Sequence, residues 1–165
     1  MAFSKRLADL AERTLDAAKA KGWSVVTAES CTAGKLAALL SEAPGASERL
    51  HGGFVTYTKD NKTRALGVSA ELLRQKSAVC GDVAVAMAEG ALARSPANIA
   101  VAITGVAGPE PDEDGNPVGL VCIALAASNA QPIQIEKRYG EIGRDAIQER
   151  AMADALTELI GAIAK

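Results

Sequence analysis

The sequence has 165 residues, of which 48% are hydrophobic and 23% are charged, and its formal net charge is -2. This length and composition predict one folded domain over residues 1–165 and exclude a disordered chain and a strongly basic nucleic-acid binder. An aromatic content of 3% also argues against a surface that stacks single-stranded bases. We therefore expect a globular protein with one hydrophobic core and no nucleic-acid partner.

The three cysteines, Cys31, Cys80 and Cys122, are odd in number and lack paired close spacing. Their pattern argues against both a disulfide framework and a zinc knuckle. Residues 1–15 alternate charged and apolar side chains without an apolar signal region, and no apolar run approaches the ~18 residues of a membrane span. We predict a cytoplasmic protein with no membrane partner, no metal and no cofactor.

Apolar residues at steps of three and four, followed by Gly22, predict a first helix over residues 3–21. The later segments follow from similar patterns of apolar spacing and turn residues. Further helices are predicted over residues 32–41, from residue 69, over 81–94 and over 144–163, with a helical turn at 65–67. Strands are predicted over residues 23–27, 52–57, 99–103, 118–126 and 134–139. Helices interleaved with short apolar strands indicate a three-layer α/β architecture.

Glu29, Ser30 and Cys31 stand at the corner between the first predicted strand and the following helix. Backbone N–H groups at a helix N-terminus are unpaired and lie at its positive end, so a hydroxyl or thiol there has an oxyanion site close by. Alternatively, Ser30 or Thr32 caps the helix, which is the commoner role of such residues. Cys31 can act as a nucleophile, although a free cysteine is more often a small buried side chain.

Polar, glycine-containing segments follow three of the predicted strands, after Ala28, Tyr57 and Ile103. In open α/β sheets the carboxyl ends of parallel strands meet at one edge, and ligands bind there. We expect this edge to bring together Ser30, Tyr57, Lys62, Thr104 and Gly105.

A serine nucleophile needs a base, and the only histidine, His51, precedes its strand whereas the candidate site follows the strands. This order disfavours a Ser-His-Asp triad. Lys62 is the better candidate because burial or a neighbouring cation lowers the pKa of a lysine; the alternative is a solvated charge on a helix face. Thr104 and Gly105 either bind the substrate or oxyanion, or form a tight turn that requires positive φ at Gly105.

Residues 110–117 are acidic and rich in turn-forming residues, which predicts a mobile loop. The carboxylates at 112–114 have the chemistry to bind a hard cation. Two prolines and the absence of an EF-hand pattern favour a solvated loop instead.

Several separated segments resemble the C-terminal domain of the CinA family, in the same order and over almost the whole chain. They are residues 28–34 (Ala-Glu-Ser-Cys-Thr-Ala-Gly), 53–57 with Lys62 five residues on, 66–68, 87–92, and 104–109 with 117–119. The resemblance implies a three-layer α/β/α sandwich with a mixed, mostly parallel sheet, assembled as a homo-oligomer. It also implies a standalone amidohydrolase that converts nicotinamide mononucleotide to nicotinate mononucleotide and ammonia in pyridine-nucleotide recycling.

By this resemblance Ser30 matches the nucleophile of the family and Lys62 its base. Tyr57 matches a residue of the same site and is expected to orient Lys62 or to donate a proton. Arg144 matches an arginine near the substrate phosphate. The residues expected to contact the substrate are Glu29, Cys31, Thr32, Thr104, Gly105 and Arg144.

The chain also departs from the family pattern. Ala33 replaces a usual glycine, Ile142-Gly143-Arg144 stands where Gly-Asp-Arg is common, Gln148 replaces an arginine, and residues 110–116 are acidic where glycines are frequent. Two other functions remain open: an amidase for another small amide with the same Ser30 and Lys62 chemistry, and a non-catalytic nucleotide-binding module of the same fold.

Overall fold

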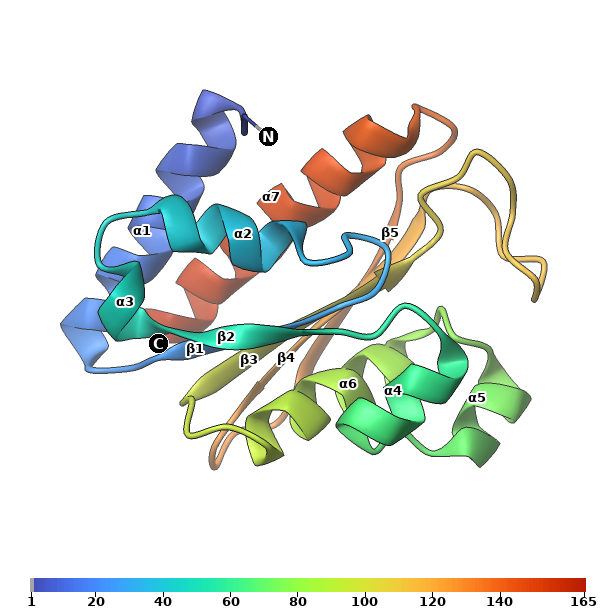
Figure 1. Ribbon diagram of the computed structural model, residues 1–165, viewed down its shortest axis with the longest axis horizontal. Helices are drawn as coiled ribbons and strands as arrows, with labels where there is room; N and C mark the ends of the chain where they lie inside the picture. The colour runs from blue at the N-terminus through green and yellow to red at the C-terminus, as the bar shows by residue number, and fades with distance from the viewer. Residues whose placement is uncertain (1) are drawn as a thin grey trace.

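A five-stranded sheet lies at the centre of the computed structural model, which describes residues 2–165 (Figure 1). The strands are β1 (Val25–Glu29), β2 (Leu50–Val55), β3 (Ile99–Gly105), β4 (Leu120–Ala127) and β5 (Ile133–Arg138), in the spatial order β2-β1-β3-β4-β5. β1 pairs in parallel with β2 and β3, whereas β3 with β4 and β4 with β5 pair antiparallel. Of these five strands only β4 runs against the others, so the sheet is mixed and mostly parallel, as predicted.

Helices cover both faces of the sheet and complete a three-layer α/β/α sandwich (Figure 1). One face carries α1 (Lys5–Lys21), α2 (Lys35–Glu42), α3 (Ala46–Arg49) and α7 (Arg144–Ile163). The other face carries α4 (Lys59–Leu66), α5 (Ala70–Lys76) and α6 (Gly81–Ala93). None of the helices within residues 2–165 combines the length and the apolar character needed to cross a lipid bilayer.

The core lies around the three inner strands. All residues of β1 are buried, and so are all but the last residue of β3 and of β4, because helices cover both of their faces. The edge strands β2 and β5 alternate half-buried and exposed residues instead. Both segments are strands, as predicted. The continuous apolar run at 99–103 lies in a strand that is covered on both faces, and the alternating run at 134–139 lies in an edge strand.

Two helices near the carboxyl ends of the strands differ from the prediction. α2 begins at Lys35 rather than near residue 32, because a turn over residues 31–34 precedes it. The polar run before the predicted turn at 65–67 is itself helical: the Thr58 hydroxyl accepts a hydrogen bond from the Asn61 N–H and caps α4. Lys62 consequently lies in the middle of a helix and has a fixed direction.

Between β1 and β3 the chain runs first over one face of the sheet and then over the other. It passes from β1 to β2 through α2 and α3, and then from β2 to β3 through α4, α5 and α6 on the opposite face. β1 and β3 are nevertheless neighbours. Strand connections that diverge in this way leave a crevice at the carboxyl ends of the strands, which is where open α/β sheets bind ligands.

Candidate active site

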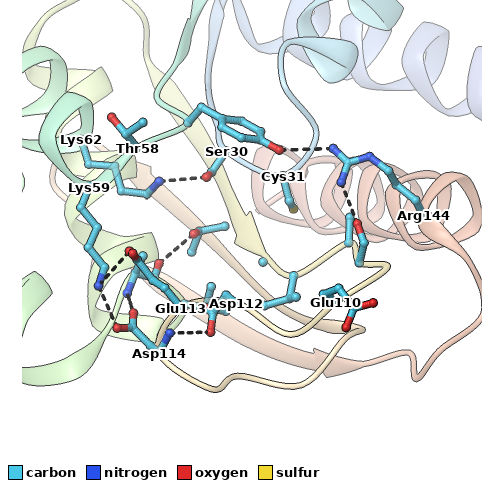
Figure 2. A pocket seen from close by; sticks show the side chains of 18 residues that line it. Ser30, Cys31, Thr58, Lys59, Lys62, Glu110, Asp112, Glu113, Asp114 and Arg144 are labelled. Carbon is cyan, nitrogen blue, oxygen red and sulfur yellow. Dashed lines mark hydrogen bonds and ion pairs between the residues drawn. The ribbon is translucent and has the colours of Figure 1, made fainter.

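A cavity of about 520 Å³ opens at the carboxyl ends of β1, β2 and β3 (Figure 2). The residues of the predicted site that line it are Ser30, Cys31, Tyr57, Lys62, Thr104, Gly105 and Arg144. Glu29 and Thr32 do not line it, and the only histidine, His51, is exposed on the edge strand β2 outside it. Among residues 2–165, no group of three or more His, Cys, Asp or Glu side chains is arranged to hold a metal ion.

Ser30 and Lys62 are in direct contact inside this cavity. Lys62 Nζ donates a hydrogen bond to Ser30 Oγ at 2.8 Å (Figure 2). It donates a second one to the carbonyl oxygen of Thr56, also at 2.8 Å. Lys62 is only 1% exposed and forms no ion pair with any residue that the structure describes. Burial therefore lowers the pKa of Lys62 to about 8, which makes its neutral form accessible near physiological pH.

Backbone contacts hold Ser30 at the end of the sheet. The Ser30 N–H donates to the carbonyl oxygen of Ile103 in β3 at 2.9 Å, and the Thr56 N–H donates to the carbonyl oxygen of Glu29 at 2.8 Å. The hydroxyl of Ser30 thus projects from an anchored backbone, while Lys62 approaches it from α4. The carbonyl of Thr56, which no sequence pattern indicated, is the second anchor of the lysine amine.

Glu29, which does not line the cavity, stabilises the segment that carries Ser30. Its buried carboxylate accepts hydrogen bonds from the N–H groups of Leu36 and Ala37 in the first turn of α2, at 2.8 and 3.0 Å. It also accepts from the hydroxyls of Thr32 at 2.7 Å and Thr27 at 3.1 Å. Glu29, and neither Ser30 nor Thr32, therefore satisfies the start of α2, where a carboxylate also matches the positive end of the helix.

Replacing Glu29 by alanine should lower the free energy of unfolding by about 3 kcal/mol, because two helix N–H groups and two buried hydroxyls lose their acceptor. Urea unfolding of the variant and the wild type measures this loss. Glu42→Ala, at the exposed end of the same helix, is the control and should stay within about 0.5 kcal/mol of the wild type. A loss below about 1 kcal/mol in Glu29→Ala would show that solvent replaces the carboxylate.

The turn between β1 and α2 carries unpaired backbone N–H groups. Within residues 2–165, the N–H groups of Cys31 and Thr32 donate no hydrogen bond to the backbone of another residue. The Cys31 thiol is 5% exposed, and burial raises its pKa to about 12, so it stays protonated at neutral pH. The thiolate needed for a cysteine nucleophile is therefore scarce, whereas the free amides are suited to bind an oxyanion.

Gln148 holds the same turn from α7. Its side chain is buried, its Nε2 donates to the carbonyl oxygen of Cys31 at 2.8 Å, and its Oε1 accepts from Lys35 Nζ at 2.5 Å. The residue that departs from the family pattern here is thus a structural link between α7, the turn and α2.

Ala33 lies in the left-handed region of backbone conformation, with φ of 47°. Its side chain is exposed, so its methyl group makes little contribution to packing. Alanine is strained at positive φ whereas glycine is not, which accounts for the glycine of the family pattern.

Ala33→Gly should therefore raise the free energy of unfolding by roughly 0.5–1 kcal/mol, as urea unfolding can measure. Ala38→Gly is the matched control, since Ala38 is exposed in the interior of α2 and the same substitution there should cost about 1 kcal/mol. Equal destabilisation by both substitutions would contradict the strain at Ala33.

Thr104 and Gly105 end β3 at the cavity. Thr104 Oγ1 is buried and donates to the carbonyl oxygen of Ala78 at 2.8 Å, which joins β3 to the segment before α6. Gly105 does not have the positive φ that a tight turn would require. Glycine is needed there for another reason: a Cβ would lie 2.9 Å from the carbonyl oxygen of Leu120 and 2.7 Å from a methyl of Val121 in β4.

Tyr57 and Arg144 lie together at the mouth of the cavity. Arg144, the first residue of α7, donates from Nη1 to the carbonyl oxygen of Gly108 at 3.0 Å and from Nη2 to the Tyr57 hydroxyl at 3.4 Å. Tyr57 is 59% exposed, and its hydroxyl has no hydrogen bond with Lys62. The structure thus places Tyr57 beside the arginine rather than beside the lysine that it was expected to orient.

These observations define a three-layer α/β protein that carries a buried serine–lysine pair in a cavity at its strand ends. Residues 7–163 match the model of the CinA C-terminal domain, and the chain belongs to that family.

The chain is 40% identical over 153 residues to the nicotinamide-nucleotide amidohydrolase PncC of Escherichia coli strain K12, a match that covers 93% of this chain and 92% of that protein. A putative competence-damage inducible protein of Symbiobacterium thermophilum is 44% identical over 143 residues. That match covers 82% of this chain but 34% of the longer relative, so the chain spans about a third of its length. The crystal structure of a competence/damage inducible protein from Agrobacterium tumefaciens superimposes with a TM-score of 0.94 at 44% identity, covering 100% of this chain and 99% of that one.

Proposed function

We propose that this protein is a nicotinamide-nucleotide amidohydrolase, which converts nicotinamide mononucleotide and water to nicotinate mononucleotide and ammonia. The observation that carries the proposal is the 2.8 Å contact between Lys62 Nζ and Ser30 Oγ, made by a buried lysine with a lowered pKa inside a cavity. The match over 93% of this chain and 92% of a relative named for this activity supports the choice of substrate.

In the acylation half of the reaction, the neutral amine of Lys62 takes the proton of the Ser30 hydroxyl, and Oγ attacks the carboxamide carbon. The oxygen of the resulting tetrahedral intermediate accepts hydrogen bonds from the free N–H groups of Cys31 and Thr32. The carbon–nitrogen bond then breaks as Lys62 returns the proton to the leaving nitrogen. Ammonia departs and an ester on Ser30 remains.

In the deacylation half, Lys62 is neutral again and removes a proton from a water molecule, which attacks the ester carbon. The same N–H groups stabilise the second tetrahedral intermediate. The bond to Ser30 Oγ breaks, and the proton passes from Lys62 to Oγ. The carboxylic acid that forms keeps the second proton of the water molecule and loses it to solvent as the carboxylate product leaves. Lys62 is the base and the acid of both halves, which its contact with Ser30 Oγ permits.

Arg144 is the candidate ligand of the substrate phosphate. It lines the cavity at its mouth, and a guanidinium can form two charge-assisted hydrogen bonds with a phosphate. Its contact with the Tyr57 hydroxyl favours a role for Tyr57 in orienting Arg144 over the expected role at Lys62.

The proposal is tested by an ammonia-release assay on nicotinamide mononucleotide and on a panel of other small amides. We expect kcat/KM for the nucleotide to exceed that for every other member of the panel by at least tenfold. A preference for another amide would support the alternative amidase, and a nucleotide that binds but stays intact over hours would support a non-catalytic binding module. Either result would overturn the proposed substrate.

Three further parts of the proposal rest on composition or on the family resemblance alone. They are a cytoplasmic location, an assembly of identical subunits and a role in pyridine-nucleotide recycling. Sedimentation equilibrium of the purified chain tests the assembly directly, with a mass above 16.9 kDa expected for an oligomer.

A further inference from the structure

One wall of the cavity is formed by the acidic loop, residues 110–116. The carboxylates that line the cavity are Glu110, Asp112, Glu113 and Asp114 (Figure 2). Within the loop, Asp112 Oδ1 accepts hydrogen bonds from the N–H groups of Asp114 at 3.1 Å and of Asn116 at 2.7 Å. The acidic loop, which the sequence predicted to be mobile, thus has a conformation with its own internal hydrogen bonds.

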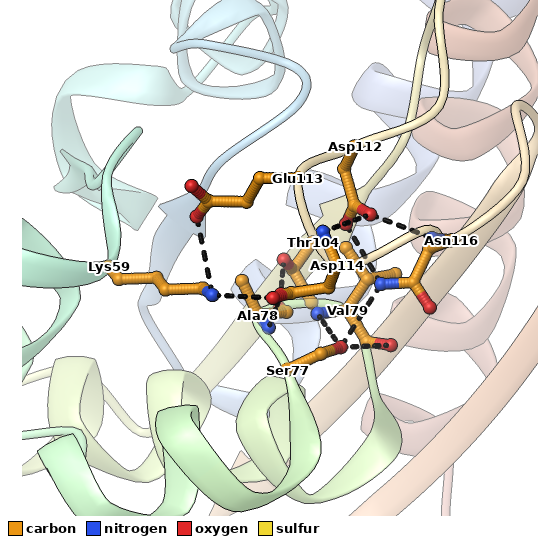
Figure 3. A network of polar contacts seen from close by, with 9 residues as sticks. All are labelled: Lys59, Ser77, Ala78, Val79, Thr104, Asp112, Glu113, Asp114 and Asn116. Atoms are coloured by element: carbon orange, nitrogen blue, oxygen red, sulfur yellow. Dashed lines mark hydrogen bonds and ion pairs between the residues drawn. The ribbon is translucent and has the colours of Figure 1, made fainter.

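The acidic loop is joined to two other parts of the cavity wall (Figure 3). Lys59 Nζ lies 2.8 Å from Asp114 Oδ1 and 3.2 Å from Glu113 Oε1. On the other side, Asp114 Oδ2 accepts from the Ala78 N–H at 3.3 Å, and Asn116 Nδ2 donates to Ser77 Oγ at 3.1 Å. Lys59 therefore supplies the only ion pairs between the acidic loop and the rest of residues 2–165.

Lys59 and the candidate base belong to the same short helix. Lys59 begins α4, and Lys62 lies three residues further along, so the ion pairs set the position of the acidic loop relative to the serine–lysine pair. The side chains of Lys59 and Asp114 are 31% and 26% exposed. One amine that contacts two carboxylates and is partly shielded from water has a stronger electrostatic attraction than an isolated ion pair on the surface. This attraction still weakens as the salt concentration rises.

The ion pair also affects the ionisation of both partners. The hydrogen bond with Asp114 raises the pKa of Lys59 and lowers that of Asp114, so both groups stay charged at neutral pH. Lys59 is paired with carboxylates of the acidic loop. Of the three cations that line the cavity, Lys62 and Arg144 therefore form no ion pair within residues 2–165.

We propose that Lys59 is a positioning residue that holds the acidic loop against the cavity, so that the loop closes the substrate pocket beside Ser30 and Lys62. Without these ion pairs the loop keeps only two uncharged partners, the Ala78 N–H that donates to Asp114 and the Ser77 hydroxyl that accepts from Asn116. Two carboxylates in the cavity also lose their counter-charge. Binding of a phosphate-bearing substrate then weakens, whereas the chemical step at Ser30 is affected little. The kinetic part of this inference rests on the proposed function.

The test compares Lys59→Met with Arg64→Met. Arg64 pairs with Asp60 on the same helix, but both side chains are about three-quarters exposed and neither lines the cavity. In Lys59→Met we expect amide hydrogen exchange in the acidic loop to become at least tenfold faster, and KM for nicotinamide mononucleotide to rise about tenfold with kcat within threefold. Arg64→Met should change none of these quantities. Lys59→Arg should restore slow exchange and low KM, since arginine can reach two carboxylates.

Loop exchange at the wild-type rate in Lys59→Met would overturn the inference. So would faster exchange with unchanged KM, or a fall in kcat at constant KM, because neither fits a residue that positions a binding wall. Should the wild type release no ammonia from the nucleotide, the proposed function fails. The hydrogen-exchange comparison would still decide whether Lys59 holds the acidic loop.

Discussion

Replacing Ser30 by alanine should lower kcat for ammonia release from nicotinamide mononucleotide by at least about three orders of magnitude. Removal of a nucleophile abolishes the covalent route and leaves only the contribution of binding and oxyanion stabilisation. The fold should persist, because the backbone hydrogen bond from Ser30 to Ile103 and the contact of Lys62 with the Thr56 carbonyl remain. Steady-state kinetics with nicotinamide mononucleotide measures the effect.

Two variants make this result specific. Ser41→Ala removes an exposed hydroxyl that is bonded within α2, and it should behave as wild type. Cys31→Ala should lose far less activity than Ser30→Ala, because burial raises the pKa of the Cys31 thiol and keeps it protonated. Wild-type ammonia release by Ser30→Ala would refute the nucleophile, and a larger loss in Cys31→Ala would assign that role to the thiol.

Activity should rise with pH and level off with a midpoint near pH 8. The rate depends on the neutral form of Lys62, and burial lowers its pKa to about 8, so roughly a tenth of the protein carries the neutral amine at pH 7. A pH profile of kcat/KM between pH 6 and 10 measures the midpoint. Lys62→Arg keeps a cation but cannot supply a base, so it should lose at least about a thousandfold in kcat. A profile that is flat across pH 8 would contradict Lys62 as the base.

The same pKa makes stability depend on pH in a defined direction. Between pH 8 and 10.5 the unfolded chain, with an ordinary lysine pKa of 10.5, binds more protons than the folded protein. The free energy of unfolding should therefore rise as pH increases through this window, by about 3 kcal/mol in total, and this contribution should be flat below it. Urea unfolding of the wild type and Lys62→Met at several pH values isolates the effect, which the variant should lack. A wild-type curve parallel to that of the variant would show that the lysine is solvated in the folded protein.

The layers of the fold follow from local sequence patterns. The continuous apolar run of β3 and the alternation of β5 encode one covered and one edge strand, and the bounds of α7 were predicted at both ends. The length of α4 was underestimated because its first six residues, 59–64, are all polar. Its N-cap at Thr58 and its C-cap at Gly67 define it better than hydrophobic spacing does.

The catalytic candidates were also visible in the sequence, because Ser30 and Lys62 follow strands whose carboxyl ends share an edge. The sequence could not determine which polar side chains are buried in the folded protein and which partners they then have. Glu29 was expected to contact the substrate, yet its carboxylate accepts hydrogen bonds from the N–H groups of Leu36 and Ala37 in the first turn of α2. Gln148 appeared only as a departure from the family pattern, yet it donates a hydrogen bond to the Cys31 carbonyl in the turn after Ser30. No sequence pattern indicated the ion pairs between Lys59 and the acidic loop.

The sequence by itself thus determined the order of the five strands and of the longer helices, the family and the residue types at the strand ends, but it did not predict the short helix α3. Only the tertiary structure decided that Lys62 lies beside Ser30 and forms no ion pair within residues 2–165. It also decided that the Tyr57 hydroxyl contacts Arg144 and not Lys62. Hydrophobic periodicity, which predicts helices and strands, depends on residues that are neighbours in the sequence. The pKa of a lysine and the partner of a carboxylate depend instead on burial by segments that are far away in the chain.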